Sequence, residues 1–437
     1  MKRTAVAAAV AIAFADSSIV VLALPELYGR FHTTITGVSW VITAYNLAVA
    51  LTAFALVLFA HRVYAGRLLA AGLVVFLVAS ICCAVSESLA FLIAARSVQG
   101  IGAALLLAGS LPVLGARRWT IVGTFGLAVG PALGGILTQA FDWRAIFIAQ
   151  APVAALGLVG TIRAHPHEVV DERPRPLPGR VLPANTCLAL LFGALVGALF
   201  LAVLLVISVW NYSPIGGAFV VSALPVSALA ARPLEARLPR LVAVWGGAAL
   251  LAGGLIGLAL LPSASVWLMV WALALCGAGL GLAVPVLSNA ALDLGPGLTR
   301  SGTLTVGARH LGLVLAIALI APLLASKVPA AGDRALLKGT AVLLDAPIGL
   351  DKKVPVALDL RGAFAQARAG VTPDLAEPFN KHGAQHDPAL AAARDKLLGA
   401  IESTITRASR SAFFVCAGFA ALALVLALAF RRRLEMS

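Results

Sequence analysis

Residues 126–135 read Gly126-Leu-Ala-Val-Gly130-Pro131-Ala132-Leu133-Gly134-Gly135 and contain no polar side chain. Gly126, Gly130 and Gly134 recur at every fourth position, so on a helix they form a smooth stripe that another helix can approach closely. Pro131 removes one backbone donor and bends the helix where this stripe runs. A bent, glycine-striped helix in apolar surroundings predicts a membrane bundle, and it suits two halves that rock against each other.

The composition of the whole chain places it in a lipid bilayer. Hydrophobic residues make up 61% of the 437 residues and charged residues 12%, and the mean hydropathy is +0.98. A soluble domain of this length could not cover its surface with so few charges. Residues 181–231 and 241–292 contain no charged side chain, and each segment is long enough for two membrane-spanning helices of about 20 residues.

The same pattern along the chain predicts an all-α integral membrane protein with twelve spanning helices. They are expected at about residues 5–28, 38–60, 68–86, 90–114, 119–139, 144–163, 184–210, 214–231, 241–261, 265–291, 302–326 and 411–430. The first is too long, and too closely followed by others, to be a cleaved signal peptide.

Basic residues in the predicted loops gather on one side of the membrane. Seventeen Lys and Arg residues fall there, whereas the short loops opposite contain Arg30, with Arg144 at a helix end. This asymmetry predicts cytoplasmic N- and C-termini and a multi-pass protein of the cell membrane. The net charge of +14 suits the anionic inner leaflet, so no nucleic-acid partner is needed to explain it.

The chain divides into two halves of six predicted spans each. Residues 1–163 form the first bundle, and a proline-rich polar segment, 164–183, reads as a cytoplasmic linker. Residues 184–437 form the second bundle, with an extracytoplasmic insert at 327–410. Two equal bundles predict a binding site between them near the midplane of the membrane.

The polar insert is expected to contain short helices. Asp387-Pro388, followed by apolar residues at helical spacing, predicts a capped amphipathic helix, and pieces near 334–344 and 356–369 are further candidates. A small cap and a gating or docking role remain open as its purpose.

Ionisable residues within the predicted spans indicate the working parts. Asp16 lies in the middle of the first span, where burial favours the neutral carboxyl and allows it to take up and release a proton. Arg96 in the fourth span can stabilise a nearby carboxylate, and Gln99 or a backbone carbonyl is expected to satisfy its donors. A fixed structural ion pair is the alternative for both charges. Arg309 and His310 form a second candidate pair, with His310 as a titrating group or a hydrogen-bonded filler.

Several of these segments resemble motifs of the major facilitator superfamily. The Gly126–Gly135 segment is similar to the antiporter motif in the fifth helix of its exporters. The segment from Arg96 through Gln99, Gly100 and Gly102 resembles the fourth-helix motif, and the resemblance implies a role for Arg96 in proton transfer. The segment that starts at Asp16 resembles the first-helix motif of the drug:proton antiporter branch with fourteen spans. The chain lacks the extra central helix pair of that branch, so a twelve-span relative is expected.

Two departures from the family pattern affect the expected mechanism. The cytoplasmic loop after the second span retains only His61, Arg62 and Arg67 of a longer charged motif, which should weaken a latch that closes the inside. Ile207 replaces a polar glutamine in the seventh span, and Val21 replaces an asparagine in the first. Both changes predict a more apolar cavity.

The leading hypothesis is a proton-coupled secondary exporter of a small lipophilic or cationic compound, working by alternating access. Asp16, Arg96, Arg309 and His310 are the proton-coupling candidates. The residues expected to line the cavity are Tyr45, Asn46, Trp210, Asn211, Trp271 and Asn289. The expected partners are the bilayer, protons and a small-molecule substrate, and a monomer is expected. A transport-deficient receptor or accessory subunit and a uniport or uptake carrier are the alternatives.

An enzyme is disfavoured, because no catalytic set or phosphate-binding loop is visible. The five cysteines lie in predicted spans without metal-ligand spacing, so neither a metal nor another cofactor is expected.

Overall fold

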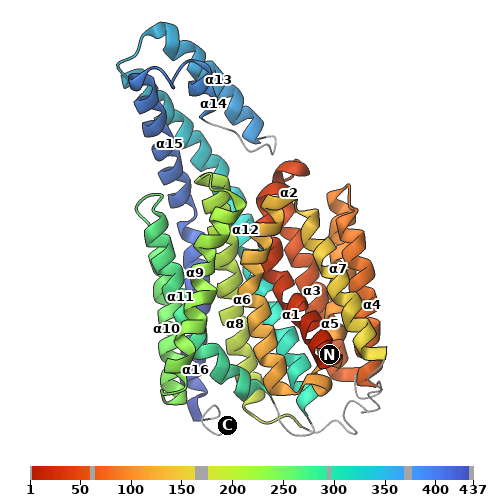
Figure 1. Ribbon diagram of the computed structural model, residues 1–437. Coiled ribbons are helices and arrows are strands. Elements are labelled where there is room, and N and C mark those ends of the chain that lie inside the picture. Colours follow the sequence, from red (N-terminus) through yellow and green to blue (C-terminus); the bar gives the residue numbers. More distant parts are fainter. Residues whose placement is uncertain (1, 60–63, 163–175, 293–296, 369–375, 433–437) are drawn as a thin grey trace.

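The computed structural model describes residues 2–59, 64–162, 176–292, 297–368 and 376–432, and these residues fold almost entirely into helices (Figure 1). Twelve helices in this part of the chain are long and apolar enough to cross a membrane, as the sequence predicts. The helices are α1 (Lys2–Ile19), α2 (Leu24–Arg30), α3 (Ile35–Phe59), α4 (Ala65–Ala84), α5 (Leu89–Leu114), α6 (Ala116–Ala140), α7 (Arg144–Ile162), α8 (Val181–Val203), α9 (Pro214–Glu235), α10 (Arg240–Ala259), α11 (Val266–Ala291), α12 (Leu298–Asp345), α13 (Leu350–Arg368), α14 (Glu377–Lys381), α15 (Pro388–Ala408) and α16 (Arg410–Ala429).

The first span of each half changes its winding near the outer end. A 3₁₀ segment, η1 (Val20–Ala23), joins α1 to α2, and a π-helical segment, η3 (Leu204–Val209), follows α8. The two irregular regions contact the opposite half, since η1 packs against α8 and α9 and α2 packs against η3. The two irregularly wound segments, η1 and η3, therefore lie where the halves contact each other.

The eleventh span is longer than the sequence predicts. Instead of ending near residue 326, α12 continues as one helix to Asp345, so the separate helix expected near 334–344 is its extension. Residues beyond Lys327 are mostly Ala, Leu, Lys and Arg, which favour helix, and α15 packs alongside the extension.

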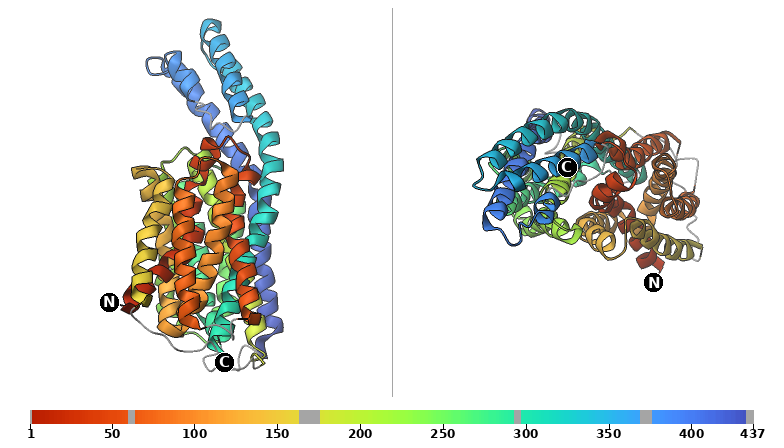
Figure 2. Two further views of the ribbon diagram at one scale, coloured as in Figure 1. Left: turned by 90° about the vertical axis from the view of Figure 1, so that its right-hand side faces the viewer. Right: turned by 90° about the horizontal axis from the view of Figure 1, so that it is seen from above.

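The insert forms a helical projection above the membrane bundles, opposite both chain termini (Figures 1 and 2). It has a hydrophobic core of its own, built around Val356, Phe379, Leu390 and Leu397. Asp387 caps α15 as predicted, accepting hydrogen bonds from the backbone N–H groups of Ala389 and Leu390. A hydrogen bond from Lys352 (2.7 Å) holds the pKa of Asp387 below its usual value.

The hydrophobic core shows which ends of the two bundles are packed together. Residues near the outer ends of the first six spans, such as Leu24, Ile42 and Trp143, belong to one continuous core with the second bundle. The inner ends of the first six spans form a second core, around Phe76 and Leu107, to which the second bundle adds little beyond Val306. The outer ends of the two halves therefore share one core, while at the inner ends α12 packs on the first bundle, with Gly302 against Leu111 and Gly307 against Phe54.

Candidate transport site

A fully buried ion pair lies at the centre of the first bundle. The Arg96 guanidinium on α5 contacts both carboxylate oxygens of Asp16 on α1, at 2.9 Å from Nη1 to Oδ1 and 2.7 Å from Nη2 to Oδ2. Both side chains are 0% exposed. Each charge would be very unfavourable here alone, so removing one partner leaves the other unpaired.

Two glutamines extend the ion pair into a hydrogen-bonded cluster. Arg96 Nη1 donates to Gln99 Oε1 (2.6 Å), and Gln99 Nε2 donates to Gln150 Oε1 (2.6 Å) and Ser80 Oγ (2.8 Å). Gln150 Nε2 in turn donates to Asp16 Oδ1 (2.8 Å). The contact between Arg96 and Gln99 was expected from the sequence, whereas Gln150 and Ser80 were missed. An amide in the middle of an apolar span is the signal that could have identified Gln150.

Aromatic rings and backbone carbonyls complete the surroundings of Arg96. Its Nε donates to the carbonyl of Val41 (3.1 Å), and its guanidinium lies 4.2 Å from the centre of the Tyr45 ring and 5.6 Å from that of Phe147. Tyr45 is itself fixed by a hydrogen bond from its hydroxyl to the Ala13 carbonyl (3.1 Å). Every side of the charged group is therefore occupied by protein.

A second polar chain joins the two bundles beside this cluster. Ser17 Oγ donates to Asn46 Oδ1 (3.1 Å), and the same oxygen lies 2.6 Å from Nδ1 of His310 on α12. Since an amide oxygen only accepts, the His310 proton must be on Nδ1 for this contact to be a hydrogen bond. Ser17 is adjacent to Asp16 in the chain, so a buried polar route leads from the second bundle to within one residue of the ion pair.

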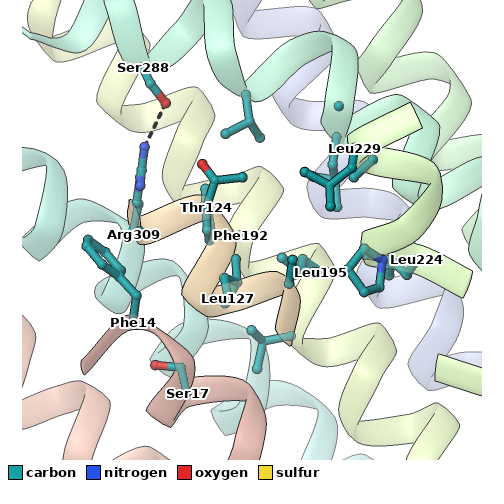
Figure 3. Close-up of a pocket in the computed structure, with 18 of the residues that line it drawn as sticks. Phe14, Ser17, Thr124, Leu127, Phe192, Leu195, Leu224, Leu229, Ser288 and Arg309 are labelled. Atoms are coloured by element: carbon teal, nitrogen blue, oxygen red, sulfur yellow. Dashed lines mark hydrogen bonds between the residues drawn. The ribbon is translucent and has the colours of Figure 1, made fainter. Parts of the chain in front are cut away.

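A cavity opens between the two bundles on the cytoplasmic side of this cluster (Figure 3). Its lining residues come from α1, α6, α8, α9, α11 and α12, and Ser17 and His310 lie among them. Thr120, Arg232 and Ser288, near the cytoplasmic ends of their helices, also line it. The cavity therefore lies in the cytoplasmic half of the bundles. It has a volume of about 110 Å³ and is partly open to its surroundings.

The glycine stripe of α6 runs along the first span, beside this cavity. A Cβ atom at Gly126 would collide with the carbonyl of Ala11, and one at Gly134 with the carbonyl of Ile19. Gly130 faces Ser18 on α1, and Gly135 faces Ala218 on α9. The stripe thus allows α6 to pack closely on the first span and on the second bundle. Pro131 lies inside α6 without ending it and lines the cavity.

The glycines of the fourth-helix motif likewise allow α5 to pack closely on neighbouring helices. Gly100 faces the carbonyl of Tyr45 on α3, and Gly102 faces the backbone of Phe76 on α4. Close packing on both sides holds the face of α5 that contains Arg96 toward α1.

Arg309 lies in the cavity wall and does not contact Asp16. Its Nη2 donates to Ser288 Oγ (2.7 Å), and its guanidinium lies 4.7 Å from the centre of the Phe192 ring. Figure 3 shows Arg309 and Ser288 on the same side of the cavity as Thr124 and Phe14. The structure therefore separates Arg309 from the first-bundle ion pair with which it was grouped.

The residues guessed from the sequence as cavity lining are placed elsewhere. Trp271 is 70% exposed on the outer surface of α11, and Asn211 and Asn289 are also exposed. Trp210 is buried near the outer end, where it donates to Thr406 (3.1 Å) at the base of the insert. None of these four lines the cavity, and this expectation is corrected.

The remaining predicted residues lie next to the cavity or beyond the described part. Tyr45 and Asn46 are fully buried behind the cavity wall. In the cytoplasmic loop, His61 and Arg62 lie outside the described residues, and the Arg67 guanidinium lies 5.0 Å from the centre of the Tyr64 ring. Among the described residues no group of His, Cys, Asp and Glu could hold a metal ion.

Sequence comparisons agree with this architecture. The chain is 33% identical over 177 residues to the drug efflux pump JefA of Mycobacterium tuberculosis, covering 38% of this chain and 34% of that protein. It is 32% identical over 175 residues to the methylenomycin A resistance protein of Streptomyces coelicolor, covering 37% of each. These matches span about a third of the relatives' length.

The fold has close counterparts among solved structures. A bacterial homologue of the human lysosomal transporter Spinster, in an inward-facing and unoccupied conformation, superposes with a TM-score of 0.63, covering 98% of this chain and 97% of that one. The sequence identity is 15%, so this likeness concerns the fold alone. The sequence model of the Major Facilitator Superfamily matches residues 6–321, most of the membrane-spanning region. The chain therefore belongs to the Major Facilitator Superfamily, as a membrane protein with multiple spans.

Proposed function

We propose that this protein exports a small lipophilic compound in exchange for protons. The observation that carries the proposal is the fully buried pair of Asp16 and Arg96, next to a cavity between two bundles whose lining extends to residues near their cytoplasmic ends. Relatives named as drug efflux and resistance proteins support export as the direction of transport.

The contacts of Asp16 explain how proton transfer is linked to conformation in this proposal. Protonation of Asp16 removes the charge that Arg96 compensates, and the guanidinium is then left buried with only neutral partners. Arg96 is held by groups on three different helices, α1, α3 and α5, so its release shifts how these helices pack. A proton is taken up at Asp16 when the site opens outward and is released when the ion pair re-forms in the inward-facing state.

The cavity wall accounts for the lipophilic substrate. Phe192, Leu195, Leu224 and Leu229 are among the apolar residues that line the cavity (Figure 3), and apolar surface favours apolar ligands through the hydrophobic effect. His310 connects this wall through Asn46 to Ser17, which gives a bound compound a route to influence the ion pair.

Reconstituted proteoliposomes with an imposed pH gradient test the proposal. Fluorescent lipophilic compounds should move against their concentration gradient while protons move the opposite way, as reported by a pH dye inside the vesicles. In Asp16→Asn, uphill transport should fall to the level of empty vesicles, since the side chain can no longer exchange a proton, whereas compound binding persists.

The matched control is Asp345→Asn, which makes the same change at an exposed site in the insert and should leave transport unchanged. Proton-coupled transport by Asp16→Asn at the wild-type rate would refute the role of Asp16. Tight binding without proton flux in the wild type would instead favour a receptor.

A further inference from the structure

Two arginines lie within the membrane bundles near the cavity, and they are compensated in different ways. Arg96 contacts both oxygens of Asp16 and also donates to Gln99 and a backbone carbonyl. Within the described part of the chain, Arg309 donates one hydrogen bond, to Ser288, and its guanidinium lies against the face of Phe192. Its Nε is buried and has no hydrogen-bond partner among the described residues. A guanidinium has five N–H donors in a planar fork, so most of the donor capacity of Arg309 is unused.

The charges along the cavity wall have one sign. Arg309 and Arg232 line the cavity, and among the described residues that line it none is acidic. Neither arginine forms an ion pair with a carboxylate in the described part of the chain. Asp16 is fully buried behind the wall and already paired, so it cannot serve as a counter-ion in the cavity.

An apolar wall with an uncompensated guanidinium selects ligands by charge. A cation in this cavity would meet two like charges and no carboxylate, which is unfavourable in surroundings of low dielectric constant. A carboxylate, sulfonate or phosphate group matches the planar fork of arginine and can accept two hydrogen bonds from it at once.

We propose that the cavity binds amphipathic organic anions, with the acidic group on Arg309 and the apolar body against the leucines of α8 and α9. Arg232, near the cytoplasmic end of α9, attracts such anions toward the mouth. This inference rests on the proposed function, because it takes this cavity as the place where the exported compound binds. It replaces the cationic substrates expected from the sequence with anionic ones.

Calorimetric titration of the purified protein in detergent, with empty micelles as the blank, tests the charge preference. The probes share one apolar body: naphthalene-2-sulfonate, 2-naphthylmethanol and 2-naphthylmethylammonium. In the wild type the sulfonate should bind at least about tenfold more tightly than the ammonium compound. Arg309→Gln should weaken sulfonate binding by about tenfold or more and leave binding of the alcohol nearly unchanged.

Three variants separate the ligand role of Arg309 from effects on folding and surface charge. Arg237→Gln removes an exposed arginine near the end of α9 and should leave all three affinities unchanged. Binding of the alcohol reports an intact cavity in Arg309→Gln. If that binding is lost, Arg309→Lys decides the question, because it keeps the charge without the fork and should bind the sulfonate with intermediate affinity.

The inference is overturned if the ammonium probe binds as tightly as the sulfonate, if Arg309→Gln leaves sulfonate affinity unchanged, or if no probe binds. Because binding is measured without a pH gradient, its outcome is independent of proton coupling. Anion binding without proton flux would refute the exchange mechanism alone, whereas proton-coupled export of cations would refute the anion preference alone.

Discussion

At the scale of single residues, the sequence indicated the charges but not the neutral groups that hold them. Asp16 and Arg96 were identifiable because charged side chains are rare in apolar spans. Gln150, Ser80 and the linking role of Asn46 were not predicted, because uncharged polar residues occur in many spans for ordinary packing. The structure shows that these neutral groups determine how the buried charges are satisfied.

The contacts of Gln150 predict a positioning role for this residue. In Gln150→Leu, Asp16 Oδ1 and Gln99 Nε2 each lose a buried partner, which should cost about 1–3 kcal/mol of stability and leave the carboxylate less fixed. Proton flux should therefore reach its half-maximal rate at a shifted pH while compound binding stays unchanged. The measurement is the pH profile of proton flux in proteoliposomes.

The control for Gln150→Leu is the same change at Gln385, an exposed residue of the insert, which should leave the profile unaltered. An unchanged pH profile in Gln150→Leu would show that Gln150 is structural filler.

At the scale of helices, residue spacing and residue type predicted where the helices lie in the sequence. They did not predict which face of each helix turns toward the cavity. Twelve spans, the glycine stripe of α6 and the cap of α15 followed from spacing and residue type. The residues that line the cavity did not follow, because helices that are apolar on all sides give no periodic signal of which face turns inward. Trp271 illustrates this, since an aromatic residue expected in the cavity lies on the outer surface.

The packing of α6 on α1 predicts an unequal cost for two glycine substitutions. In Gly126→Ala the new methyl group meets the Ala11 carbonyl, which belongs to a rigid helix backbone, and the strain should destabilise the protein by about 1–3 kcal/mol. Gly418→Ala on α16 places the methyl group in open space and should be neutral or slightly stabilising, because alanine favours helix more than glycine does. Thermal unfolding of the purified protein in detergent measures both. A Tm for Gly126→Ala equal to that of Gly418→Ala would contradict the close packing.

At the scale of the whole molecule, the hydrophobic cores show how the two bundles meet. One core joins both bundles near the outside, and a separate core holds the inner ends of the first bundle. The insert stands apart from this interface with a core of its own, so it can fold independently of which side the bundles open toward (Figure 1). This division could not be predicted from the sequence, because it depends on the relative rotation of the two bundles.

The central claim is that protonation of Asp16 changes which side of the protein is open. In this account the ion pair with Arg96 belongs to the state that is open toward the cytoplasm, so loss of the pair in acid should favour closure of the inner side. Spin labels at Arg117→Cys and Arg237→Cys, on the cytoplasmic ends of the two bundles, report this closure in reconstituted protein. Labels at Arg67→Cys and Arg117→Cys, both in the first bundle, serve as the control pair. The partly buried Cys82 is replaced by alanine in every variant.

The most direct test is the distance between the Arg117 and Arg237 labels as the pH falls from neutral to acidic. The account predicts that this distance shortens in the wild type, that it is short at every pH in Asp16→Asn, and that the control pair does not respond. A wild-type distance that does not depend on pH, or the same pH response in Asp16→Asn, would contradict the account.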